Sequence, residues 1–78
     1  MITGSQLRAA RALLNISAEE LAKLSNIGIA TIRRAEANDG PTKLTAANLA
    51  AAQTALEAAG VEFIPENGSG PGVRLRKT

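Results

Sequence analysis

Residues 17–36, SAEELAKLSNIGIATIRRAE, decide the fold, because they predict two short helices joined by a tight turn. Ser17 followed three residues later by Glu20 is a capping box, which opens the first helix. Asn26 marks the end of that helix, since asparagine tolerates the left-handed backbone conformation, and Gly28 is an acceptable N-cap for the second helix. Only about three or four residues separate the helices, so we expect them to meet at a corner.

The apolar positions of both helices agree with this corner. Leu21 and Ala22 face inward, Leu24 is a further inward candidate, and Ile27 fills the turn. At about 100° per residue, the inner side of the second helix is formed by Gly28, Thr31, Ile32, Ala35 and Glu36. Its outer side is formed by Ile29, Ala30, Arg33, Arg34 and Ala37. The outer side therefore offers two arginines among small and apolar groups.

Helices are also predicted on both sides of this pair. Thr3 and Gln6 form a capping box for a helix that ends near Asn15. After the turn signal at residues 38–41, Thr45 caps an alanine-rich helix that Gly60 closes.

The composition changes after Gly60. Residues 61–64 and 73–76 are short β-type segments, and the breaker-rich loop between them predicts a β-hairpin, with a disordered tail as the alternative. The predicted fold is mainly α: a four-helix domain in residues 1–60, followed by a C-terminal β-hairpin and tail in residues 61–78.

Two opposite charges interrupt the apolar stripes. Arg11 lies between Leu7 and Leu14 on the first helix, and Glu36 lies one turn beyond Ile32. We expect Arg11 and Glu36 to form an ion pair that ties these helices together, although each side chain could instead reach solvent separately.

Composition excludes several functions. The 78 residues contain no cysteine and no histidine, which removes disulfides, zinc clusters, thiolate nucleophiles and imidazole bases. We therefore expect no enzyme, no metal and no cofactor. No apolar run reaches the roughly 18 residues of a membrane span, and no signal peptide is visible, so we expect a cytoplasmic protein without a membrane partner. The net charge of +2 favours an anionic partner only weakly.

Residues 17–36 resemble the helix-turn-helix of the Cro/phage-repressor (XRE-like) family. The resemblance extends over about residues 3–59 and includes Arg11, Leu21–Ala22, Thr31–Ile32 and Glu36. It implies a helical bundle whose third helix enters the DNA major groove, and in this family the helix-one arginine commonly pairs with the glutamate that ends helix three. The chain departs from the family at Ala18, where members often have a DNA-contacting glutamine, and at Gly28 and Ile29, where members often have serine and a polar residue. A hairpin also replaces the fifth helix of some members.

The resemblance implies double-stranded DNA as the partner. Arginine commonly reads guanine, and apolar side chains can contact thymine methyl groups, so the candidate base contacts are Gly28, Ile29, Ala30, Arg33 and Arg34. One arginine could meet a base while the other meets a phosphate. The candidate phosphate contacts are Ser17, Ala18, Asn38 and Lys43, with Lys23 and Arg8 as weaker candidates.

The predicted function is therefore a sequence-specific DNA-binding transcriptional regulator. The alternative is a helix-turn-helix module that has lost base readout and binds a protein, as an antiactivator or antitoxin-like adaptor does. We expect a homodimer on a pseudo-palindromic operator, because one such helix covers few base pairs. The hairpin is the predicted dimer element through its apolar residues Val61, Phe63, Val73 and Leu75.

Overall fold

The computed structural model describes residues 2–76, so Met1 and residues 77–78 of the predicted tail lie outside the described part of the chain. Within residues 2–76 there are four helices and two strands. The helices are α1 (Gly4–Leu14), α2 (Ala18–Ser25), α3 (Ile29–Glu36) and α4 (Ala46–Ala58), and the strands are β1 (Val61–Ile64) and β2 (Gly72–Leu75). This is the mainly α fold with a C-terminal hairpin that the sequence predicts.

The helices begin and end where capping chemistry places them. Thr3 and Ser17 each complete a capping box, and Thr45 caps α4 with its hydroxyl. Asn15 and Asn26 adopt left-handed conformations, with φ of 57° and 56°, directly after α1 and α2. These ends satisfy backbone groups that would otherwise lack partners, so the helix boundaries follow from local sequence.

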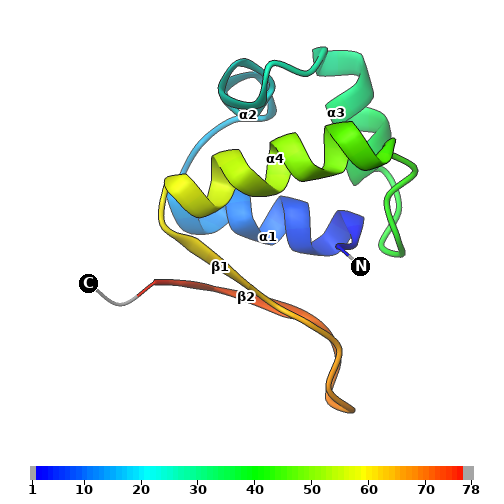
Figure 1. Cartoon of the computed structure of the whole chain (residues 1–78), viewed down its shortest axis with the longest axis vertical. Coiled ribbons are helices and arrows are strands. Elements are labelled where there is room, and N and C mark those ends of the chain that lie inside the picture. The colour runs from blue at the N-terminus through cyan, green and yellow to red at the C-terminus, as the bar shows by residue number, and fades with distance from the viewer. Residues whose placement is uncertain (1, 77–78) are drawn as a thin grey trace.

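The core lies between the helix pair and the hairpin. α2 packs against α3 and α4, and α1 packs against α3 and both strands. The hairpin lies on the side of α1 and α4 that is away from α2 and α3 (Figure 1). The largest fully buried side chains are Leu7, Leu21, Ile32, Leu56 and Val61. Helices and hairpin thus contribute to one hydrophobic core.

Leu24 does not join this core and is 57% exposed. The buried stripe of α2 is formed by Leu21, Ala22 and Ser25, and at 100° per residue Leu24 lies roughly a third of a turn away from its centre. The prediction that Leu24 faces inward is therefore wrong.

Gly4 allows α1 to begin against the segment that follows α3. Its N–H donates to the carbonyl of Gly40 at 2.9 Å. A Cβ at this position would lie 2.0 Å from the carbonyl oxygen of Asn38 and 2.7 Å from that of Ala35. No larger residue fits this contact without movement of the backbone.

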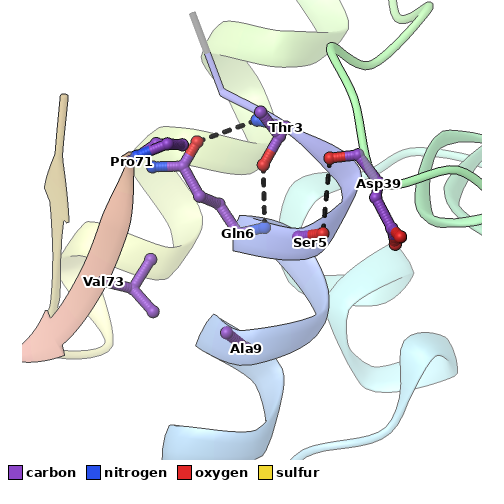
Figure 2. Close-up of a pocket in the computed structure, with 7 residues that line it drawn as sticks. All are labelled: Thr3, Ser5, Gln6, Ala9, Asp39, Pro71 and Val73. Atoms are coloured by element: carbon purple, nitrogen blue, oxygen red, sulfur yellow. Dashed lines mark hydrogen bonds between the residues drawn. The ribbon is translucent and has the colours of Figure 1, made fainter. Parts of the chain in front are cut away.

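The hairpin is attached to α1 by Gln6. Its Nε2 donates to the carbonyls of Ile64 and Gly72, at 3.3 and 3.0 Å, while its Oε1 accepts from the Thr3 N–H at 2.9 Å. Figure 2 shows the Gln6 side chain extending from the first turn of α1 toward Pro71, the residue before β2. One buried amide therefore completes the α1 cap and also holds the strand ends next to the loop.

The two strands pair antiparallel, with Val61 opposite Leu75 and Phe63 opposite Val73. These four side chains share one face, because directly opposite residues point to the same side of a sheet. On the other face Arg74 Nε donates to Glu62 Oε1 at 2.6 Å, and this hydrogen bond lowers the pKa of the Glu62 carboxyl.

In the loop between the strands, the Glu66 carboxylate accepts hydrogen bonds from the N–H groups of Gly68 and Gly70.

Among residues 2–76, no helix is long and apolar enough to cross a membrane.

Candidate nucleic-acid interface

The outer face of α3 carries Ala30, Arg33 and Arg34, all of them exposed. Gly28 caps the helix without a side-chain hydrogen bond and is also exposed. Ile29 differs from the expectation of an outward side chain, because it is half-buried and packs against the core. Ile29 is the first residue of α3, beside the turn, and it lies on the same side of the helix as buried Glu36. The exposed ridge of α3 is therefore narrower and more basic than the helical wheel predicts.

Arg11 and Glu36 fix the far end of α3 to α1. Arg11 donates from Nε to Glu36 Oε2 at 2.8 Å and from Nη2 to Oε1 at 2.7 Å, in a two-pronged ion pair. Glu36 is 7% exposed and the Arg11 side chain 22% exposed. The hydrogen bond to Glu36 raises the pKa of Arg11. A third bond, from Arg11 to the Ile16 carbonyl, also ties this end to the segment before α2.

Arg8 strengthens the same attachment. Its guanidinium donates to the backbone carbonyls of Glu36 and Asn38 and pairs with the Asp39 carboxylate. The hydrogen bond from Arg8 lowers the pKa of Asp39. A cation at the last carbonyls of a helix stabilises that end. Because both terminal nitrogens of its guanidinium are engaged within the chain, Arg8 is a poorer phosphate contact than the exposed cations of α3.

The other candidate phosphate contacts differ in which hydrogen-bond donors or charges are still free to bind a phosphate. The Ser17 hydroxyl accepts from the Glu20 N–H, and the Ser17 N–H donates to the Glu20 carboxylate, so the hydroxyl hydrogen is the one donor that Ser17 keeps for a phosphate. Ala18 is half-buried at the first turn of α2, which leaves only its backbone N–H for a phosphate. The side chains of Asn38 and Lys43 are exposed on the segment between α3 and α4.

Charge is distributed unevenly over the described residues. Arg8, Arg11 and Arg74 each pair with a carboxylate, whereas five other cations form no salt bridge within residues 2–76: Lys23, Arg33, Arg34, Lys43 and Arg76. Four of these five belong to α2, α3 or the segment after α3, and Arg76 follows β2. An unneutralised group of cations around one exposed helix is the electrostatic pattern of a nucleic-acid surface.

Comparison with known families agrees with this geometry. A family model described as Helix-turn-helix, of the XRE/Cro type, matches residues 7–52. That match covers more than half of the chain. The protein belongs to this helix-turn-helix family. Membership indicates DNA as the partner of the helix-turn-helix and a role in transcriptional regulation, in a family that is typically not enzymatic. A comparison with curated proteins found no match.

The helix-turn-helix match ends within α4, so the hairpin lies outside it. Of the apolar hairpin residues, Val61 is fully covered by the helices and has no surface for a second subunit. Phe63 and Val73 are half-buried against the core, and Leu75 is 52% exposed. The predicted dimer surface is thus partly covered within the chain, and Leu75 is the most exposed of its four apolar side chains.

Two contacts of the helix-turn-helix are not indicated by the sequence pattern. Thr31, expected on the inner side of α3, is half-buried beside Arg34, whose Nη2 donates to its hydroxyl at 3.4 Å. The proximity of Gly4 to Asn38 is a long-range contact that no local pattern encodes.

Proposed function

We propose that this helix-turn-helix protein is a sequence-specific transcriptional regulator that binds a pseudo-palindromic operator as a homodimer, with α3 in the major groove. The observation that carries the proposal is the exposed, unneutralised face of α3, on a helix whose far end is held by Arg8 and Arg11. A recognition element gains from rigidity, because side chains that are already oriented lose less entropy when they bind.

The outer face of α3 supplies few but strong contacts. An arginine can donate two hydrogen bonds to O6 and N7 of guanine, which discriminates by roughly 1–3 kcal/mol against other bases. Gly28 and Ala30 are small, which lets the helix lie deep in the groove, and the exposed part of Ile29 is suited to a thymine methyl group. Ser17, Ala18, Asn38 and Lys43 remain the proposed phosphate contacts, with the free backbone N–H of Ala18 acting at the start of α2.

The homodimer rests on the hairpin. Arg76 N–H donates to the Gly60 carbonyl at 2.6 Å, so Glu62 and Arg74 form the next hydrogen-bonded pair of the ladder. The backbone groups of Val73 and Leu75 then point away from β1, and within the described chain no backbone hydrogen bond from another segment reaches them. An open strand edge beside exposed Leu75 is suited to pairing with a second copy about a two-fold axis.

The experiment that tests this function removes the basic face of α3. The Arg33→Ala/Arg34→Ala double variant should fold as the wild type does, because both side chains are exposed, and should lose at least 10-fold in affinity for a selected duplex. Gel-shift titration measures the affinity, and circular dichroism checks the fold. Wild-type affinity in the double variant would contradict the proposed function.

A protein-interaction module is the second candidate, favoured by one observation. Leu24 is exposed on α2, next to the turn that precedes α3, where an apolar side chain suits a protein surface better than a phosphate backbone. Salt separates the two functions, because DNA affinity falls steeply as salt is added while apolar association does not.

A further inference from the structure

The two arginines of α3 lie in different surroundings. Arg34 lines a hollow of about 190 Å³ together with Thr31, Ala35, Lys43 and Leu44, and Arg33 is not among the residues that line it. Its lining comes from α3 and from the segment that leads to α4. Residues 33 and 34 are separated by about 100° around the helix axis, so they flank opposite sides of the ridge formed by Ala30 and Ala37.

The hollow has the chemistry of a phosphate site. Arg34 and Lys43 bring two positive charges to it from separate segments, and neither forms a salt bridge within residues 2–76. Thr31 adds a hydroxyl, which accepts from Arg34 Nη2 at 3.4 Å and retains its own O–H to donate. Ala35 and Leu44 complete the lining with apolar groups.

We infer that Arg34, Lys43 and Thr31 form a clamp for one phosphate of the DNA backbone, so that Arg33 is the arginine left for base readout. This inference rests on the proposed function and assigns the phosphate contact and the base contact to two adjacent arginines. The hydrogen bond to Thr31 draws Arg34 toward the loop side of α3, away from the ridge that faces the base edges. Lys43, on the other wall, supplies a point charge, for which a phosphate is a good partner and a single base edge a poor one.

This assignment predicts that alanine variants of Arg33 and Arg34 lose DNA affinity in different ways. A phosphate contact contributes to every duplex and to the salt dependence, whereas a base contact contributes to the selected sequence alone. Arg34→Ala and Lys43→Ala should therefore weaken binding to selected and unrelated duplexes by the same factor. Each should also reduce the slope of log affinity against log salt by about 1. Arg33→Ala should lose on the order of 10-fold on the selected duplex and much less on the unrelated one.

The experiment measures affinity by fluorescence anisotropy for both duplexes at four or more salt concentrations. Arg76→Ala is the matched control: it removes an exposed cation directly after β2, outside α3 and the segment that follows it, and should leave the slope unchanged. A second arm replaces single phosphates of the selected duplex with neutral methylphosphonates. One such position should weaken the wild type and have no further effect on Arg34→Ala or Lys43→Ala.

The possible failures are distinguishable. If wild-type protein binds the selected duplex no better than the unrelated one, the proposed function is wrong. If wild-type binding is specific, but Arg34→Ala loses affinity only on the selected duplex with an unchanged salt slope, Arg34 reads a base and the clamp is wrong. Loss of the methylphosphonate effect in Arg33→Ala, with its retention in Arg34→Ala, would reverse the assignment.

Discussion

Arg8 and Arg11, one turn apart on α1, hold the last residue of α3 by different groups. Arg11 binds the Glu36 carboxylate and Arg8 binds the Glu36 carbonyl. Glu36 is the one of these three residues whose removal leaves a buried, unpaired cation, because Arg11 is largely covered by the protein. Breaking a buried pair costs more than the pair itself contributes, since the remaining charge has lost its hydration.

The first prediction concerns this ion pair. Glu36→Ala should lower the free energy of unfolding by about 3 kcal/mol. Urea denaturation followed by circular dichroism measures the change. Glu19→Ala, an exposed carboxylate on α2 without a salt bridge, is the control and should change stability by less than about 1 kcal/mol. Equal losses in the two variants would show that the Arg11–Glu36 pair is not energetically buried.

Gly4 is the second residue for which the structure predicts the effect of a substitution on stability. Gly4→Ala forces a Cβ into the carbonyls of Asn38 and Ala35, so the start of α1 must move away from the end of α3. We expect a loss of about 1–3 kcal/mol, although alanine has the higher helix propensity. Gly40→Ala is the matched control, because a Cβ there meets only the side-chain oxygen of Asn38, at 3.5 Å. A Gly4→Ala protein as stable as the wild type, in thermal unfolding, would contradict this close contact.

At the scale of elements, caps and turns explain why the helix ends were predictable. The capping boxes at Thr3 and Ser17 and the left-handed Asn15 and Asn26 act within a few residues, so the sequence displays them directly. The position of Leu24 was not predictable in the same way, because burial on α2 depends on where α4 crosses it. The attachment of the hairpin through Gln6 joins residues 58 and 66 positions apart in sequence, which no local pattern reveals.

The prediction at this scale concerns the hydrogen bonds that Gln6 makes to the hairpin. Gln6→Met keeps the volume of the side chain but removes its hydrogen bonds, leaving the Ile64 and Gly72 carbonyls without that partner. Stability should fall by about 1–3 kcal/mol, and hydrogen exchange should quicken in β1 and β2 more than in α2 and α3. Gln53→Met is the control, because Gln53 bonds only the Glu57 side chain. Unchanged exchange in the strands would show that Gln6 does not hold the hairpin.

The whole molecule combines two separate surfaces: the basic face of α3 and the open edge of β2. The composition of the site could be predicted from sequence, since α3 and its arginines follow from a 3.6-residue period. Their surroundings could not, because Thr31 and Lys43 meet only when the segment after α3 folds back beside it. The sequence also did not indicate which apolar hairpin residues are exposed to a partner, because Val61 packs inside its own chain.

The dimer prediction uses the one apolar hairpin residue that is well exposed. Leu75→Glu places a charge beside the open β2 edge and should convert a dimer to a monomer, because an unpaired charge cannot be buried without a large cost. Light scattering at matched concentrations measures the mass. Leu24→Glu is the control, with a similar exposure of 57% against 52%, because Leu24 belongs to α2, which lies on the other side of α1 and α4 from the hairpin (Figure 1). A mass that stays dimeric in Leu75→Glu would remove the hairpin edge from the interface.

The most direct test of the central claim, that this helix-turn-helix reads a DNA sequence, is selection of bound duplexes from a random pool by the wild-type protein. We expect enrichment of one motif as an inverted repeat, with half-sites about 10 base pairs apart and with guanine at the positions that Arg33 reads. The enriched duplex should bind at least about 1,000-fold more tightly than random DNA at the same salt. A pool that remains random after repeated rounds, with equal affinity for all duplexes, would contradict sequence-specific recognition by α3.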